Sequence, residues 1–194
     1  AVRGAHLWFQ VYIWPDRKMS HEVIERAKAA GFEALIVTVD SPVSPNREYN
    51  LKSGYTIPFT FNRNNIADVL MHPRWLFGVL TRYILTTGVP RYANYPGAIK
   101  KRVTAAPLGR AMMKSPNMTW DDLKVLRRMW PHRLMVKGIL HPNDAVIAAD
   151  CGADGVIVSN HGGRNFDSTR APIEALPAVV HAVGHRIAVL VDSG

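Results

Sequence analysis

The sequence predicts an α/β protein in which parallel β-strands alternate with helices. Two observations support this class: short apolar runs alternate with segments of helical periodicity, and the pattern extends over five predicted strands joined by four crossovers. Such βα units fit either an open doubly wound sheet or part of a (β/α)8 barrel, and the periodicity alone does not choose between them. A third observation disfavours the dinucleotide-binding open sheet, because no Gly-x-Gly-x-x-Gly motif follows a strand.

The first two strands are predicted near the start of the chain. The apolar run at residues 7–13 is typical of a strand, and Ser20 is expected to cap the helix that follows it. Gly31 ends this helix, because glycine readily adopts the left-handed conformation that closes a helix. Residues 34–39 are apolar except for Thr38, which predicts a buried strand.

The βα pattern stops for nearly eighty residues and resumes at Thr119, which is expected to cap a helix. Pro142 opens the next helix, because proline suits the first helical position, and Gly152 closes it. Pro177 predicts a kink or a restart in the last helix. The three strands predicted in this half are 134–136, 155–158 and 187–191, and the last helix is 172–183.

Length and composition indicate one domain of a globular protein. The chain has 194 residues, of which 47% are hydrophobic and 20% charged. Its single cysteine cannot form an internal disulfide, which favours a reducing, cytoplasmic compartment. No uninterrupted apolar run is long enough to predict a membrane-spanning helix. The first residues lack both an initiator methionine and a signal-peptide pattern, so we expect a fragment of a longer chain.

The net charge of +9 comes from one segment. Residues 41–118 contain 11 Lys or Arg and 2 Asp or Glu, whereas the remaining residues contain 13 of each sign. We therefore interpret 41–118 as a basic segment inserted into a single βα domain. Basic and aromatic residues are rarely interleaved outside this segment, so nucleic acid is not an expected partner. The expected partner of the basic segment is instead an anionic membrane surface.

The basic segment also contains an apolar helical stripe. Its members recur at the spacing of one helix face and are Trp75, Leu76, Val79, Leu80, Tyr83 and Ile84. Basic residues flank the stripe, and a further basic run follows at 100–102. One interpretation is a helix that covers the mouth of an active site. The other is a helix that lies in the plane of a membrane, which predicts a peripheral protein on the inner face of the cell membrane.

Polar side chains follow every predicted strand at its C-terminal end. They are Gln10 and Tyr12, Thr38 and Asp40, Lys137, Ser159 with His161 and Arg164, and finally Asp192. Because the carboxyl ends of parallel strands share one edge, these residues are expected to lie on one rim, where α/β folds build their sites. Polar residues also occur where a strand simply ends in solvent. That alternative explains a polar residue at one strand end more easily than polar residues at all five.

The densest of these clusters is residues 159–167, which contains a glycine pair that allows a sharp turn. The turn could bring His161 and Arg164 to one pocket. Histidine suits proton abstraction near neutral pH, and arginine binds a carboxylate through two parallel hydrogen bonds. A metal site is not expected.

The cluster at 158–167 resembles the signature of the FMN-dependent 2-hydroxy-acid dehydrogenase family, which includes glycolate oxidase, lactate dehydrogenases and mandelate dehydrogenase. Similar motifs continue in order over essentially the whole chain, at residues 8–12, 38–40, 46–48, 136–138 and 191–194. Asn165 and Phe166 depart from the pattern, because relatives more often carry Gln-Leu there. Residues 72–75 resemble the bacterial membrane-associated mandelate and lactate dehydrogenases more than the soluble oxidases.

The resemblance implies a (β/α)8 barrel of which this chain covers about strands three to seven. It implies a catalytic role for His161 as the base, for Asp40 as the group that stabilises protonated His161, and for Tyr12 as a hydrogen-bonding partner of the reacting end. Arg164 and Arg47 would bind the substrate carboxylate, with Tyr12 close by. The cofactor FMN would be contacted by Gln10, Thr38, Lys137, Ser159, Asp192 and Gly194.

The implied activity is oxidation of a small L-2-hydroxy acid, of the mandelate or lactate class, to the 2-keto acid. Electrons would pass to a quinone or a cytochrome, and we expect a homo-oligomer. Two alternatives stay open: an oxidase that uses oxygen, and an FMN-dependent isomerase on a similar barrel. The two arginines beside a histidine base disfavour the isomerase, because they suit oxidation of a carboxylate substrate.

Overall fold

The computed structural model describes residues 4–41, 48–54, 60–91, 102, 105 and 118–193. The chain divides into two compact units, one formed by residues 1–46 with 110–194 and the other by residues 47–109. The division falls inside the predicted basic segment 41–118, whose extent stays a prediction.

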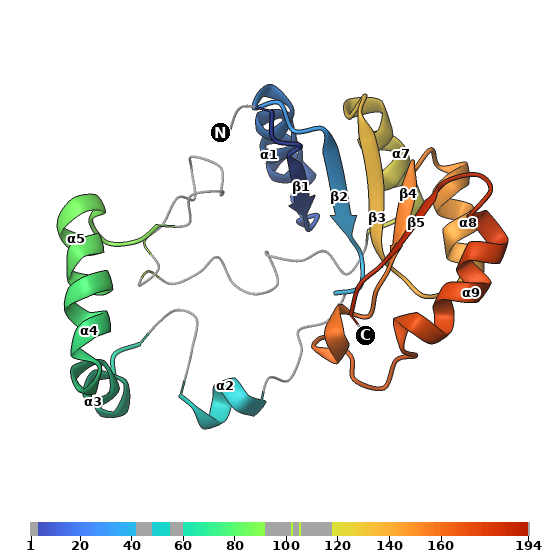
Figure 1. Ribbon diagram of the computed structural model, residues 1–194. Coiled ribbons are helices and arrows are strands. Elements are labelled where there is room, and N and C mark those ends of the chain that lie inside the picture. Colours follow the sequence, from blue (N-terminus) through green and yellow to red (C-terminus); the bar gives the residue numbers. More distant parts are fainter. Residues whose placement is uncertain are drawn as a thin grey trace. The chain divides into compact units, whose positions relative to one another are not determined.

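The first unit contains one sheet of five parallel strands that follow the order of the chain (Figure 1). The strands are β1 (Trp8–Val11), β2 (Ala34–Thr38), β3 (Arg133–Ile139), β4 (Gly155–Val158) and β5 (Ala188–Val191). A doubly wound sheet reverses its strand order at one point, whereas a barrel keeps the order throughout. The observed order is therefore that of a partial (β/α)8 barrel.

Helices cover one face of this sheet, and the hydrophobic core lies between them and the strands. The helices are α1 (Arg17–Ala29), α7 (Trp120–Met129), α8 (Pro142–Asp150) and α9 (Pro172–Val183). On the strands the core includes Val37, Val136 and Val156, which are neighbours in register, and on the helices it includes Ile24 and Val179. Burial of these apolar side chains is the main force that holds helices and sheet together.

The ends of α7 and α8 lie where the sequence predicts them. Thr119 and Asp122 form a reciprocal capping box, in which each side chain accepts a hydrogen bond from the other residue's backbone N–H. Pro142 occupies the first turn of α8. Pro177 lies within α9, which continues through it as one helix.

The prediction that Ser20 caps the first helix was wrong. The cap of α1 is Asp16, whose carboxylate accepts a hydrogen bond of 3.0 Å from the backbone N–H of Lys18. Ser20 is fully buried in the first turn, where its hydroxyl accepts a hydrogen bond of 2.8 Å from the backbone N–H of Trp14. Both residue types cap helices well, and the path of the preceding loop decided between them.

Only β4 has the bounds of its predicted run, and β1 and β3 differ most from theirs. β1 is shorter than the run at 7–13, whereas β3 extends beyond 134–136 in both directions. The extension includes Lys137, which pairs in register with Thr38 of β2 and Ile157 of β4. Lys137 ended the apolar pattern in the sequence, but its backbone still pairs with both neighbouring strands.

The second unit is helical, with α2 (Glu48–Lys52), α3 (Arg63–Met71), α4 (Pro73–Trp75), η1 (Leu76–Thr81) and α5 (Arg82–Thr87). The last three follow one another without a break, and η1 is a π-helical turn. The predicted helix that carries the apolar stripe is therefore present. None of its described side chains is buried, and the same holds for α3.

Exposed apolar residues in these helices extend beyond the predicted stripe. They include Leu70, Met71, Phe77 and Leu85, of which Met71 and Leu85 are each 80% exposed. Within the described part of the chain, no helix combines the length and apolarity needed to cross a bilayer.

Candidate active site

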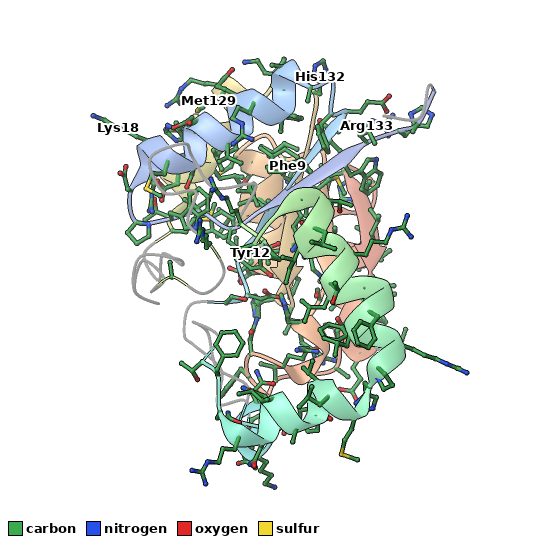
Figure 2. All side chains as sticks on the ribbon, turned by 90° about the vertical axis from the view of Figure 1, so that its left-hand side faces the viewer. Phe9, Tyr12, Lys18, Met129, His132 and Arg133 are labelled. Carbon is green, nitrogen blue, oxygen red and sulfur yellow. The ribbon has the colours of Figure 1, made fainter. Side chains whose placement is uncertain are left out.

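The candidate site lies at the carboxyl ends of the strands, as the positions of the polar residues predict. In Figure 2, Tyr12 lies beyond Phe9 along β1, away from the end where Met129, His132 and Arg133 gather. Those three residues precede or begin β3, so they mark the amino ends of the strands. All the site side chains described below belong to the first unit.

A tight turn after β4 positions the candidate base. His161, Gly162 and Gly163 have φ angles of 60°, 65° and 67°, so three consecutive residues adopt the left-handed conformation. The side chain of Asn160 accepts hydrogen bonds of 3.0 and 3.3 Å from the backbone N–H groups of Gly162 and Gly163. Glycine adopts this conformation freely, whereas a histidine there is strained, which is a common feature of functional sites.

His161 lies between Tyr12 and Asp40. Its Nδ1 is 3.0 Å from Oδ1 of Asp40, and its Nε2 is 3.3 Å from the hydroxyl of Tyr12. The Asp40 side chain is 10% exposed and that of His161 is 21% exposed. A carboxylate at Nδ1 favours the tautomer with a proton on that nitrogen, which leaves Nε2 free to accept one. This arrangement is suited to general base catalysis.

A second group of side chains surrounds Lys137, whose ammonium donates to Ser159 Oγ over 2.7 Å and to a carboxylate oxygen of Asp192. The Lys137 side chain is 11% exposed, so a cation is held at the sheet end with little contact with solvent. Ser159 Oγ also accepts from the backbone N–H of His161 over 3.2 Å, which links the two groups.

The pKa of Asp192 lies below its usual value. Burial alone would raise this pKa, but hydrogen bonds from Lys137 and Ser159, together with the positive charge of Lys137, outweigh the burial. Asp192 is therefore ionised throughout the neutral range.

Two further predicted residues meet on neighbouring strands, where the amide nitrogen of Gln10 donates to Thr38 Oγ1 over 2.8 Å. Thr38 is buried and pairs in register with Lys137. Gln10, Thr38 and Lys137 therefore form a continuous row of polar groups across the ends of β1, β2 and β3.

Among the predicted residues that the structure describes, Arg164 is the one whose side chain is not joined to these groups. Arg164 is exposed, and its guanidinium forms no hydrogen bond or ion pair with the residues that the structure describes. Its backbone N–H donates to the carbonyl of His161 over 3.3 Å, so it directly follows the His161 turn. Arg47 and Gly194 lie outside the described residues.

The sequence interpretation missed three residues that support Asp40. Asn165 donates through its side-chain amide to the backbone carbonyl of Asp40 over 3.2 Å and to Ser41 Oγ. Gly138 packs so closely that a Cβ built on it would lie 2.5 Å from Cβ of Asp40. Asn165 lies in the 159–167 cluster, Gly138 in the motif 136–138 and Ser41 directly after Asp40, but none of these positions distinguishes a supporting residue from an ordinary loop or strand residue.

The sequence of this chain is similar to those of a known protein family. The sequence matches the FMN-dependent dehydrogenase family over residues 1–194. It is 40% identical to an L-lactate dehydrogenase of Alcaligenes faecalis over 190 residues, which cover 97% of this chain and 49% of the relative.

Solved structures agree with this match. A structure of the monotopic membrane protein (S)-mandelate dehydrogenase has a TM-score of 0.84 and 34% identity, over 98% of this chain and 49% of that one. A lactate oxidase of Pediococcus acidilactici has a TM-score of 0.68 and 27% identity, over 98% of this chain and 42% of that one. The chain thus spans slightly less than half the length of each of these proteins.

Proposed function

Because the chain belongs to the FMN-dependent dehydrogenase family, we propose that the full-length protein binds FMN and oxidises a small L-2-hydroxy acid to the 2-keto acid. The names of the relatives favour the lactate or mandelate class of substrate. The observation that supports the proposal best is the arrangement of His161 between the carboxylate of Asp40 and the hydroxyl of Tyr12.

His161 acts as the general base in this proposal. Its Nε2 takes one proton from the substrate, and Asp40 stabilises the imidazolium that forms, because the carboxylate lies 3.0 Å from Nδ1. The Tyr12 hydroxyl, 3.3 Å from Nε2, orients the oxygen of the reacting alcohol beside the base. Removal of a general base typically slows a reaction by roughly 10²- to 10⁴-fold.

Arg164 binds the substrate carboxylate in this proposal. Its guanidinium is exposed, directly follows the turn that holds His161, and has no partner among the described residues that would compete with an anion. A guanidinium holds a carboxylate through two parallel hydrogen bonds, which orients the substrate as well as binding it. Arg47 is proposed to assist, on the resemblance alone.

The rim residues fit a flavin mononucleotide. The row formed by Gln10, Thr38 and Lys137 presents amide, hydroxyl and ammonium groups along one edge of the sheet, which matches the hydrogen-bonding edge of a flavin ring. FMN, when bound, would accept the two electrons and the second hydrogen that leave the substrate. Lys137 would favour negative charge on the flavin, because its cation is held in place by Ser159 and Asp192.

The test is anaerobic flavin reduction by the purified full-length protein. The protein should show a flavin absorbance spectrum that is bleached by L-lactate or L-mandelate, whereas the D-enantiomers should leave it unchanged. A protein that binds FMN but is bleached by no L-2-hydroxy acid would refute the proposed reaction. The rate of reoxidation in air distinguishes the electron acceptor: slow reoxidation favours a quinone or cytochrome, and fast reoxidation favours the oxidase.

We further propose that the second unit binds an anionic membrane surface. The support is the exposed apolar side chains of α3, α4, η1 and α5, combined with the positive charge of the segment that contains them. One structural relative is described as monotopic, which agrees with this proposal. Each basic residue near anionic lipid contributes roughly 1 kcal/mol to binding, and apolar side chains that enter the interface add to it.

Sedimentation with anionic vesicles tests the membrane proposal. Full-length protein should pellet at low salt, and 1 M salt should release only part of it, because screening weakens charge attraction but not apolar burial. Changing Phe77 and Leu85 to serine should abolish the fraction that resists salt. Tyr49→Ser, at a side chain that is 81% exposed in α2, is the matched control and should retain that fraction. Wild-type protein that stays in the supernatant at low salt would show that the membrane proposal is wrong.

A further inference from the structure

The side-chain amide of Asn165 ties the His161 turn to the end of β2. Asn165 is buried, with 8% of its surface exposed. Its Nδ2 donates to the backbone carbonyl of Asp40 over 3.2 Å and to the hydroxyl oxygen of Ser41. One amide thus contacts both Asp40, which carries the candidate carboxylate, and the residue after it. More than 120 residues separate Asn165 from Asp40 along the chain.

Ser41 passes this contact on to the carboxylate. Its hydroxyl donates to Oδ1 of Asp40 over 3.3 Å. Because the Ser41 oxygen accepts a hydrogen bond from Asn165, its own proton is directed away from the amide and toward Asp40. The same Oδ1 lies 3.0 Å from Nδ1 of His161. A continuous chain of hydrogen bonds therefore leads from Asn165 through Ser41 and Asp40 to the imidazole.

The other carboxylate oxygen does not take part in this chain. Oδ2 of Asp40 is buried and has no hydrogen-bond partner among the described residues. Among the described residues, the contacts that orient the carboxylate are therefore those of Oδ1, with Ser41 and His161. A carboxylate with a single anchored oxygen rotates readily once that anchor is lost, since its last torsion is broad.

We infer that Asn165 is a positioning residue for the His161 base. It acts through Ser41 and Asp40, which hold the imidazole in the tautomer and direction that leave Nε2 facing Tyr12. The inference rests on the proposed function, because it assigns Asn165 to the same proton transfer. Asn165 contributes to the rate of proton removal and does not bind the substrate.

The expected effect follows from the loss of the amide donor. In Asn165→Leu, a side chain of similar size keeps the volume filled but donates no hydrogen bond. The Asp40 carbonyl then loses a partner and the Ser41 hydroxyl is free to turn away from Oδ1. A displacement of about 1 Å at a catalytic group can lower a rate by about 100-fold, so we expect a loss between 10- and 100-fold.

The experiment compares variants of the full-length holoenzyme by anaerobic stopped-flow reduction of the flavin with an L-2-hydroxy acid. Asn165→Leu should lower the limiting rate constant of reduction, whereas the dissociation constant of the substrate, the bound FMN and the midpoint of thermal unfolding should change little. Asn165→Gln keeps the amide and should recover most of the rate. Ser41→Ala, a smaller change, should lower the rate in the same direction, and the double variant should lose less than the product of the two effects. Ser168→Ala, at an exposed side chain in the same loop, is the control and should behave as wild type.

Two results would overturn the inference. One is a limiting rate constant in Asn165→Leu and Ser41→Ala that stays within twofold of wild type. The other is an equal loss of rate in the Leu and Gln variants, together with loss of FMN or of thermal stability, which would show that Asn165 only supports the fold. Failure of the proposed function is a different result, because wild-type flavin would then not be reduced by any L-2-hydroxy acid.

Discussion

Gly138 allows Asp40 to reach His161, and replacing it with alanine should disconnect the two residues. Gly138 directly follows Lys137 on β3 and has a φ of +104°, in the region that disfavours residues with a side chain. An added Cβ would lie 2.5 Å from Cβ of Asp40, 2.8 Å from its Cγ and 2.9 Å from its backbone nitrogen. Carbon atoms pack at about 3.5–4.0 Å, so Asp40 would have to move by at least about 1 Å.

The size of the effect follows from this displacement. Because the backbone nitrogen is one of the crowded atoms, rotation of the Asp40 side chain alone cannot relieve the contact. A shift of about 1 Å breaks the hydrogen bond of 3.0 Å between Asp40 and His161, and we expect flavin reduction to slow by about 100-fold. Overpacking costs about 1–3 kcal/mol, and left-handed backbone costs a further 1–2 kcal/mol or so, so the variant should also be less stable.

The assay uses Gly138→Ala and Gly31→Ala in the full-length protein, measured by anaerobic flavin reduction and by urea unfolding. Gly31 has a similar φ of +81°, but a Cβ there would meet no atom within 4 Å. Gly31→Ala should therefore lose stability from backbone strain alone and reduce its flavin at the wild-type rate. The reasoning fails if Gly138→Ala also reduces flavin at the wild-type rate, or if both variants lose rate equally.

Three further predictions concern single side chains in the full-length protein. His161→Ala should retain FMN, seen by absorbance, but reduce it roughly 10²- to 10⁴-fold more slowly, and a near wild-type rate would exclude His161 as the base. Arg164→Lys keeps the charge but loses the two-pronged geometry, so stopped-flow titration should show weaker substrate binding and slower reduction together, and unchanged kinetics would place the carboxylate site elsewhere. Burial alone would raise the pKa of Asp122, but hydrogen bonds from Arg17 and Thr119 lower it. The ionised carboxylate therefore stabilises the fold above about pH 4, and this contribution is lost as pH falls through the lowered pKa. Urea unfolding of Asp122→Asn should therefore give a smaller free energy at pH 7 and a weaker dependence on pH below about 4, and an unchanged acid dependence would contradict this assignment.

The element order and the position of the candidate site residues at the strand ends could be predicted from the sequence. Apolar periodicity and helix-end residues such as Thr119 and Pro142 depend on neighbours a few positions apart, so the local sequence encodes them. Polar residues at strand ends were expected to share one rim because parallel strands point the same way. The contact between Tyr12, His161 and Asp40 is consistent with that expectation.

Which residue caps the first helix was harder to predict, because two nearby residues have a similar propensity for the cap position. Asp16 and Ser20 both suit a helix cap, and only the path of the loop around Trp14 shows which is used. The end of β3 was missed for a related reason. Lys137 reads as the end of an apolar run, but its backbone is paired by β2 and β4, which are distant in the sequence.

The sequence by itself determined the βα order, the basic and apolar character of the 41–118 segment, and the residue types available at the strand ends. Only the tertiary structure decided how those residues support one another. The contacts of Asn165 with Asp40 and Ser41 depend on strand register and on the turn after β4, and the same is true of the space that Gly138 leaves for Asp40. Such contacts join residues about 100 positions apart, and no local pattern encodes a distance that arises only when the strands pair.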